Sequence, residues 1–527
     1  MVPCSAAFAH RWRLTPLAAA VALWLMPLPA SPAGPAALPP MTPVVAPLEL
    51  RVMSFNVWYG GDQVSLPAVV EAIRRADADL VAIEEPDGHL EAIAAAAGYP
   101  YVDRRRNLIA RYPLFDSGNG LRTRAGAAPY GITALDEEHL YAWMMVRPGE
   151  VVAVANTHLP SDLYGPEAVR DGASLTEVLA LEERTRMPSA RPLLALGTLA
   201  ATGVPVFLTG DFNTPSHLDW TPAMQTLRGT AVRYPVVWPV TAALAQAGLR
   251  DSYREAHPDP VAKPGLTWTA GMPHPYVRPN ETRDRIDFIF SAGPTITLSS
   301  QLVGEPGAPE VDLAIRPYPS DHRAVVSSFS VVPVPAPALV AVEPSMVAVG
   351  ADFVVRAHDP QSAGWHVVVV PAAATPDQPL RAAREDLTAW RRMARFTSTG
   401  LAVGAYDAVL LASDGHELKR SRFAVYAPTR PPLLQVASAS LQRGQPIHLR
   451  WSNGPGHRHD WVGLFRAGDD AGVSLTIAYL QAHSQGALEL ATTSAAGPLP
   501  AGHYQLRLLR DDSPTVLATT DLILVGP

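Results

Sequence analysis

The sequence contains one cysteine in 527 residues, Cys4, and it lies in the N-terminal leader described below. Beyond the leader no thiol is present to act as a nucleophile, to bind zinc as a thiolate or to hold an iron–sulfur cluster. These three kinds of chemistry are therefore excluded. The protein could be exported to an oxidising compartment, but without cysteines beyond the leader it would not use that compartment to form a disulfide bond.

An excess of positive charge is also missing. There are 42 Lys and Arg residues against 49 Asp and Glu, which gives a net charge of −7. A protein that holds duplex nucleic acid non-specifically needs a broad basic surface. The composition therefore counts against a DNA-binding scaffold, but not against an enzyme that touches phosphates through one small site.

No apolar run is long enough to span a bilayer comfortably, which takes about 20 residues. The nearest is Pro16–Leu28, which follows a basic start at His10, Arg11 and Arg13 and precedes small residues at 30–33. This pattern predicts a secretory signal over residues 1–33, with an uncleaved anchor as the alternative. We expect a secreted or periplasmic protein without a transmembrane segment in its mature chain.

The rest of the chain divides at proline-rich linkers. A Pro/Ala-rich spacer covers 34–47, and Val332–Pro337 and Tyr426–Pro432 interrupt any continuing strand. The segments 338–428 and 433–527 look like copies of one another, since Gly404–Leu411 in the first matches Gly502–Leu509 in the second. We expect two immunoglobulin-like β-sandwich modules, which could contact a surface or a glycan.

Residues 48–332 alternate between strand and helix patterns. Strands are expected at 48–59, 80–84, 151–156, 204–209, 284–290 and 324–332, and helices at 66–76 and 240–248. Ser174 and Glu177 form a capping-box pattern that predicts a further helix with Leu175, Val178 and Leu179 on its apolar face.

Polar residues follow several of these strands. Gly210-Asp211-Phe212-Asn213 comes after an apolar strand, and Ser320-Asp321-His322 precedes another. Strand ends often carry catalytic side chains because the strand fixes their position. The other polar residues in comparable places are, in chain order, Asn56, Glu85, His158 and Asp287.

Together these residues suit phosphate-ester cleavage, which needs charge neutralisation, an activated water and a stabilised leaving oxygen. Glu85 and Asp321 are hard oxygen ligands, and Asn56 can add a carbonyl oxygen or support them, which favours Mg²⁺, or else Mn²⁺ or Ca²⁺. The remaining candidates are Asp211 to orient or deprotonate the water, Asn213 to bind a phosphate oxygen, His158 to contact the phosphate or leaving oxygen as an acid, and His322. Asp211 and His322 both remain candidates for the general base.

The six segments resemble the endonuclease/exonuclease/phosphatase superfamily over about 48–332. That resemblance implies a four-layer α/β/β/α sandwich, so the fold class is α+β, followed by the two all-β modules. It also implies that Asp287 holds the ring of His322. Relatives usually carry Gln at the position of Glu84, so an extra carboxylate there either tightens the metal site or points away.

We expect a metal-dependent phosphoric ester hydrolase, specifically a phosphodiesterase, that acts on nucleic acid, phospholipid or a small phosphodiester. A nuclease is favoured by Arg104-Arg105-Arg106 alone, and a phospholipid or sphingomyelin hydrolase by the apolar stretch Tyr234–Pro239 alone. Trp268 could stack on a base or ring, or pack in the core. A catalytically idle surface-binding protein is the contrasting alternative, although an idle copy would often have lost one member of the set.

Overall fold

The computed structural model describes residues 46–118, 140–270, 280–360, 365–385, 393–468, 474–494, 497–511 and 513–526. The predicted signal and most of the predicted spacer lie outside these residues. Residues 46–527 form one compact unit. Among the described helices, none has the length and apolar character needed to cross a membrane.

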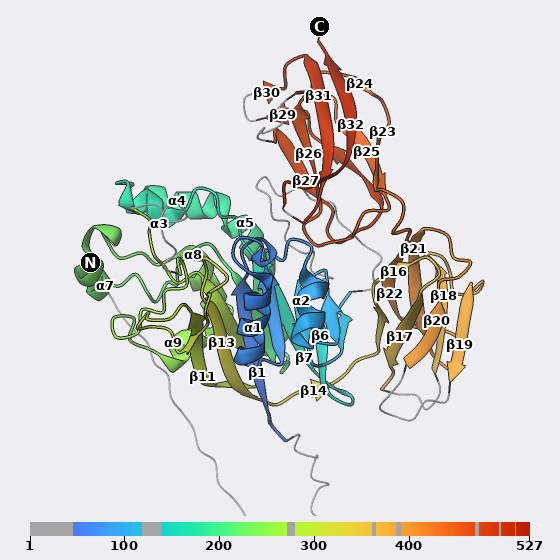
Figure 1. The fold of residues 1–527 in the computed structure, drawn as a ribbon. Coiled ribbons are helices and arrows are strands. Elements are labelled where there is room, and N and C mark those ends of the chain that lie inside the picture. Colours follow the sequence, from blue (N-terminus) through green and yellow to red (C-terminus); the bar gives the residue numbers. More distant parts are fainter. Residues whose placement is uncertain are drawn as a thin grey trace, which may run out of the picture. The chain divides into compact units, whose positions relative to one another are not determined.

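Two twisted sheets form the centre of the segment that precedes residue 338 (Figure 1). The first has the strand order β12 (Leu313–Ala314), β11 (Thr295–Gly304), β13 (Ala324–Val331), β1 (Leu48–Asn56), β2 (Leu80–Glu84), β4 (Leu108–Ala110) and β3 (Tyr101–Asp103). The second has the order β5 (Leu114–Asp116), β6 (Ala142–Arg147), β7 (Glu150–His158), β8 (Val206–Asp211), β10 (Asp287–Ala292) and β9 (Arg250–Asp251), and β14 (Val334–Pro335) pairs with β7.

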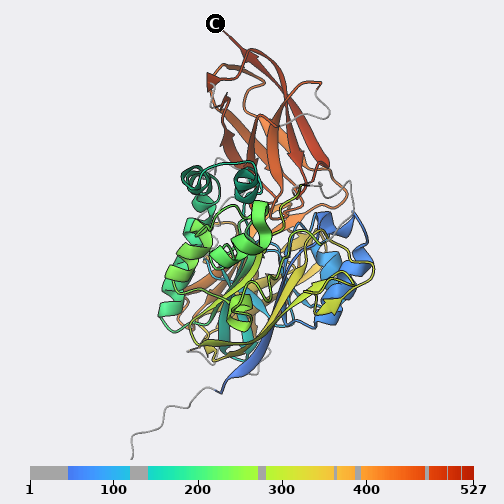
Figure 2. The same ribbon diagram turned by 90° about the vertical axis from the view of Figure 1, so that its left-hand side faces the viewer.

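Helices cover the outer faces of both sheets. In chain order they are α1 (Leu66–Ala76), α2 (Leu90–Ala97), α3 (Gly165–Arg170), α4 (Leu175–Thr185), α5 (Met187–Ala190), α6 (Ala195–Ala201), α7 (Pro222–Arg228), α8 (Pro239–Gln246) and α9 (Ser252–Ala256), with 3₁₀ turns at Tyr59–Gly61, Arg191–Leu194 and Gly229–Ala231. Figure 2 shows blue helices on one side of the strands and green helices on the other. This is the expected four-layer α/β/β/α sandwich.

The alternation of side chains along the strands explains the layers. On β1, Val52 belongs to the apolar cluster between the two sheets, whereas Met53 and Phe55 belong to the cluster under α1 and α2. On β8, Phe207 faces the other sheet and Leu208 faces the helices on the far side. Because successive strand residues point to opposite faces, a strand that is apolar throughout is buried on both faces.

Most of the predicted elements are present, with small differences at their ends. Helix α1 and strand β2 have the predicted bounds, and the Ser174–Glu177 capping box starts α4. The prediction for Leu175 was wrong: this residue is 43% exposed, since it lies in the first turn of α4, while Val178 is buried. Strand β10 begins at Asp287, not at 284, because Asp284 pairs instead with the backbone of Trp268.

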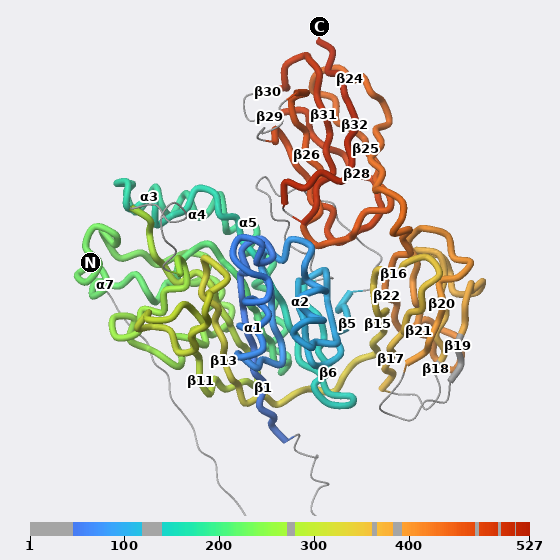
Figure 3. Tube along the Cα trace, in the orientation of Figure 1, coloured from blue at the N-terminus to red at the C-terminus, as the bar shows by residue number. Residues whose placement is uncertain are grey.

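Two β-rich modules follow (Figure 3). Module 1 (338–428) has one sheet of β15 (Leu339–Glu343), β17 (Asp352–His358) and β20 (Met393–Thr397), and another of β16 (Met346–Ala348), β22 (Glu417–Tyr426), β21 (Gly404–Leu411), β18 (Trp365–Pro371) and β19 (Arg381–Glu385). Module 2 (433–527) has one sheet of β23 (Leu433–Val436), β25 (Ile447–Ser452) and β28 (Gly486–Leu490), another of β24 (Ser440–Gln442), β32 (Val516–Val525), β31 (Gly502–Leu509), β26 (Trp461–Arg466) and β27 (Thr476–Tyr479), and the short pair β29 (Thr493–Ser494) and β30 (Gly497–Pro498).

The two modules share the same order of strands in their three- and five-stranded sheets. In each module, residues of both sheets contribute to one apolar core. This shared order agrees with the internal repeat seen in the sequence. That the modules are of the immunoglobulin type stays a prediction.

Candidate functional site

Strand pairing brings the candidate residues to one edge of the two sheets. β1 and β2 are parallel, with Asn56 opposite Glu84, and β7 and β8 are parallel, with His158 opposite Asp211. β10 runs antiparallel to β8, so the first residue of β10, Asp287, lies opposite the last residue of β8, Asp211. Parallel strands end at the same edge of a sheet, and ligands commonly bind beyond that edge.

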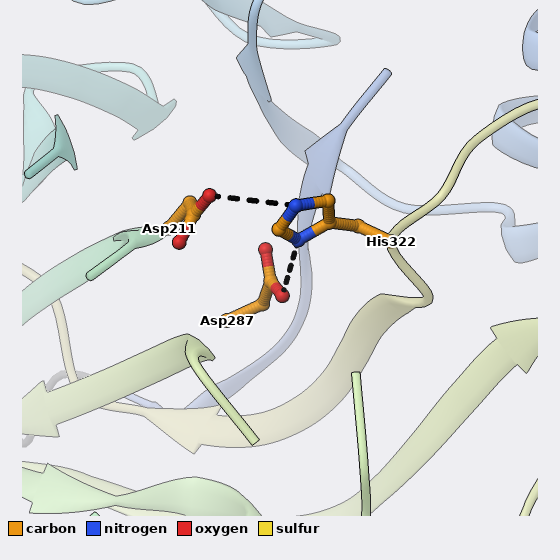
Figure 4. A group of neighbouring side chains, drawn as sticks. All are labelled: Asp211, Asp287 and His322. Carbon is orange, nitrogen blue, oxygen red and sulfur yellow. Dashed lines mark hydrogen bonds and ion pairs between the residues drawn. The ribbon is translucent and has the colours of Figure 1, made fainter. Parts of the chain in front are cut away.

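His322 lies between two carboxylates at this edge (Figure 4). Its Nδ1 is 2.9 Å from Asp287 Oδ2, and its Nε2 is 3.7 Å from Asp211 Oδ2. The backbone N–H of His322 donates to Ser320 Oγ at 3.0 Å, and that hydroxyl donates to the backbone carbonyl of Asn56 at 2.6 Å. The loop before β13 is thereby tied to the end of β1.

The electrostatic environment favours a charged imidazole. Burial lowers the pKa of His322, but the charges of Asp287 and Asp211 outweigh it and raise that pKa well above its usual value. Burial raises the pKa of Asp211 above its usual value, although the charge of His322 opposes this shift. His322 therefore donates from Nδ1 to Asp287 and presents a second N–H toward Asp211.

Asp211 Oδ2 also faces two other nitrogen atoms. His158 Nε2 lies 3.5 Å from it, and Asn56 Nδ2 donates to it at 3.1 Å. Its other oxygen, Oδ1, accepts from the backbone N–H of Asn213 at 2.9 Å. The side-chain amide of Asn213 donates to the carbonyl of Leu159 at 2.9 Å. The amide of Asn213 would have to leave that carbonyl in order to bind a phosphate oxygen.

Glu85 and Asp321 form the second part of the site. Burial and the nearby charge of Glu85 together raise the pKa of Asp321 to about 7, against the opposing charge of His322. Both side chains are partly buried, and two neighbouring carboxylates that repel each other are stabilised by a shared cation. The donor set therefore fits a hard divalent metal ion.

The sequence leaves two roles for Asn56: it could bind the metal ion through its side-chain carbonyl oxygen, or it could support the metal ligands. Its hydrogen bonds match the supporting role. Its Nδ2 donates to Glu85 Oε1 at 3.2 Å as well as to Asp211, and its Oδ1 accepts from Trp58 N at 3.1 Å. The amide thus connects the carboxylate expected to bind metal with the carboxylate expected to bind water. Its carbonyl oxygen is engaged by the backbone.

A metal ion could also be imagined among Asp211, Asp287 and His322, whose ligand atoms all lie within 4.8 Å of one another. A metal ion there would have to displace the proton that Asp287 and Asp211 favour on His322, since their charges raise the pKa of the ring well above its usual value against the effect of burial. This trio is better suited to proton transfer than to holding a cation.

Glu84 is the last residue of β2. Its side chain is buried, and burial followed by the charges of Asp287 and Asp211 raises its pKa well above the usual value. The two alternatives for this residue, to tighten the metal site or to point away from it, stay predictions. A neutral carboxylic acid in this place resembles the glutamine expected of relatives in size and polarity.

Sequence reasoning missed several residues that hold the site in place. Arg186 is fully buried: its Nε donates to the carbonyl of Asn213 at 2.5 Å, and its Nη1 is 3.1 Å from the buried Glu182. Thr267 Oγ1 accepts from the backbone N–H groups of Ile286 and Asp287 at 3.0 and 3.1 Å. Buried threonine and arginine residues are common, and only their contacts mark these two.

The weaker sequence signals are also resolved. The ring of Trp268 packs on His322, with centroids 4.8 Å apart, and is partly exposed, so it lies beside the site.

The three consecutive arginines are paired: Arg104 with Glu91, Arg105 with Asp116, and Arg106 with Asp103 and Asp116. In the apolar stretch before α8, Val236 and Trp238 are buried in a local core, although Val237 is 66% exposed. Packing is the main role of that stretch.

Comparison with known proteins gives one curated relative and several solved structures. An uncharacterized protein from Caenorhabditis elegans is 29% identical over 306 residues, which cover 53% of this chain and 91% of that protein. An endonuclease/exonuclease/phosphatase structure from Beutenbergia cavernae is 17% identical, covers 71% of this chain and 99% of its own, and has a TM-score of 0.30. Zebrafish (D. rerio) TDP2 in complex with a single-strand DNA product is 17% identical, covers 53% of this chain and 98% of its own, and has a TM-score of 0.29.

The family model described as "Endonuclease/Exonuclease/phosphatase family" matches residues 53–322, more than half of the chain. All eight candidate site residues, from Asn56 to His322, fall within the matched range. Members of this family are generally phosphoester hydrolases that depend on divalent metal ions. The chain belongs to the endonuclease/exonuclease/phosphatase family.

Proposed function

We propose that this chain is a secreted, Mg²⁺-dependent phosphodiesterase. The observation that carries the proposal is the position of His322, between Asp287 and Asp211 and next to the Glu85–Asp321 carboxylate pair. One edge of the two sheets thus offers a metal-binding pair and a proton-transfer group. Each is required for cleaving a phosphate ester, and neither is needed for a purely structural role.

Glu85 and Asp321 would hold the metal ion, with Asn56 orienting Glu85 through their hydrogen bond. A divalent cation held by this pair would neutralise phosphate oxygens that gain charge during the reaction. Asp211 accepts the proton of the attacking water, since its Oδ2 faces the site and its other oxygen is held by Asn213. His322 stabilises the phosphoryl oxygens as a cation, and His158 donates to the leaving oxygen.

The test is hydrolysis of bis(p-nitrophenyl) phosphate by the purified protein, with Mg²⁺ and with EDTA, alongside Asp211→Ala and His322→Ala. We expect activity in the wild type with Mg²⁺ only, and a loss of about 10³-fold or more in each variant. A wild type no faster than the two variants on this substrate, on nucleic acid, on lipid and on sugar phosphates would overturn the proposal.

The same panel decides the substrate class. Pairing of the three arginines weakens the case for a nuclease, and burial of Val236 and Trp238 weakens the case for a lipid hydrolase. Single-stranded DNA and sphingomyelin-containing vesicles should therefore be compared directly. A faster reaction on one of them assigns the subclass.

A further inference from the structure

A loop of module 2 reaches the candidate active site. Arg458, between β25 and β26, is 6% exposed, and its guanidinium donates to two backbone carbonyls of the catalytic domain (residues 48–332). Nη1 lies 3.2 Å from the carbonyl oxygen of Arg106, and Nη2 lies 3.2 Å from that of Asn156. A buried cation is costly unless it is fully hydrogen-bonded, so this placement specifies a defined docking position.

The two carbonyls belong to a hydrogen-bond network that includes side chains of β7 and β8. The Arg106 carbonyl also accepts from Asn156 Nδ2 at 3.0 Å, and Asn156 Oδ1 accepts from Thr209 Oγ1 at 3.1 Å. Asn156 is two residues before His158 on β7, and Thr209 is two residues before Asp211 on β8. Arg458 thus supports the ends of the strands that carry His158 and Asp211.

A second set of contacts holds the loop after Glu85. Asp511 of module 2 accepts from the backbone N–H of Gly88 at 2.7 Å through Oδ2, and from that of His459 at 3.2 Å through Oδ1. Nearby, Arg104 Nη1 donates to the carbonyl of Pro455 at 2.8 Å. Module 2 therefore forms hydrogen bonds with the segments that follow β2 and β3, as well as with the C-terminal part of β7.

Resting on the proposed function, we propose that Arg458 is a positioning residue for the phosphodiesterase site and that module 2 is an integral part of the catalytic unit. Arg458 acts through Asn156 and the Arg106 carbonyl, and not by touching substrate. This role differs from that of an appended module that only contacts a surface or a glycan. The catalytic groups tolerate little displacement, since a shift of about 1 Å can cost about 100-fold in rate.

The test uses the full-length chain with Arg458→Gln, Arg458→Lys and the control Arg466→Gln. Arg466 lies at the exposed end of β26 in the same module. With saturating Mg²⁺ and bis(p-nitrophenyl) phosphate, we expect Arg458→Gln to lower kcat by about 10- to 100-fold with KM changed by less than about threefold. Arg458→Lys keeps a cationic donor and should recover part of kcat, and Arg466→Gln should match the wild type.

Hydrogen exchange measured by mass spectrometry provides a readout besides activity. Peptides that cover 104–108 and 152–158 should exchange faster in Arg458→Gln than in the wild type or in Arg466→Gln. An active wild type with unchanged kcat and unchanged exchange in Arg458→Gln would overturn this inference and leave the proposed function standing. An inactive wild type would instead remove the proposed function. If Arg458→Gln does not fold, Arg458→Lys decides. A kcat below that of the wild type with faster exchange of the two peptides supports the inference, and wild-type values of both would contradict a positioning role for the two guanidinium hydrogen bonds.

Discussion

The Nδ1 atom of His322 lies 2.9 Å from Oδ2 of Asp287, and both side chains are buried. The strand that begins at Asp287 also pairs with the strand that ends at Asp211, so the same backbone ladder that forms the second sheet places the two carboxylates on either side of the imidazole. Sheet geometry therefore sets which ring nitrogen faces the protein and which one faces the site.

The first prediction concerns Asp287→Asn. Asparagine keeps the shape of the side chain but removes the charge that holds the imidazolium, so the ring of His322 loses its preferred protonation and orientation. We expect kcat to fall by about 10²-fold or more with KM changed only a few-fold, as measured by steady-state hydrolysis of bis(p-nitrophenyl) phosphate.

The matched control is Asp352→Asn, which makes the same change at an exposed position at the start of β17. It should leave kcat unchanged. Equal rates for Asp287→Asn and the wild type would show that His322 does not need this carboxylate.

The second prediction concerns Asp321→Asn in the absence of metal. Burial raises the folded-state pKa of Asp321 to about 7, so the stability that its protonated form provides is lost as pH rises from the unfolded-state value toward 7. At about pH 8 in EDTA, we expect the neutral asparagine to raise Tm above that of the wild type. Adding Mg²⁺ should then raise Tm of the wild type but not of the variant, because a ligand stabilises only the protein that binds it.

Differential scanning calorimetry measures both effects. A wild type whose Tm does not respond to Mg²⁺, or a variant less stable than the wild type in EDTA, would argue against a strained pair of carboxylates at Glu85 and Asp321.

The third prediction concerns the pH dependence of stability at module 2. Burial, together with the charge of Asp511, raises the pKa of Asp460 to about 8. A carboxyl whose folded-state pKa is raised favours the folded state at low pH and loses that contribution as pH rises toward about 8. The Tm of Asp460→Asn relative to the wild type should therefore increase steadily between about pH 5 and pH 8.

Thermal scans at several pH values test this directly. A Tm difference that stays constant with pH would mean that Asp460 titrates in the folded protein as it does in the unfolded chain.

Much of the site was predictable because its residues sit where apolar strands end. Asp211 and Asn213 follow a strand recognisable from its β-branched and apolar residues, and Asp321 and His322 precede another. Their convergence follows from parallel pairing, which brings strand ends to one edge of a sheet. For such residues, the local sequence pattern that marks a strand end also predicts where the residue lies in the folded protein.

Other features depend on contacts that no local pattern encodes. Arg186 lies at the end of a helix and Arg458 in a loop more than a hundred residues beyond the catalytic domain, yet each donates to carbonyls beside the site. The hydrogen-bond directions of Asn56 were likewise open, because an amide can present either its oxygen or its nitrogen. Only the packed structure chooses between such alternatives.

The most direct test of the account is anomalous diffraction from crystals of the protein soaked in Mn²⁺. We predict a peak bounded by the carboxylates of Glu85 and Asp321, which disappears in Glu85→Gln. A peak held by Asp211, Asp287 and His322 instead, or none beside Glu85, would contradict the division of this edge into a metal-binding pair and a proton-transfer group.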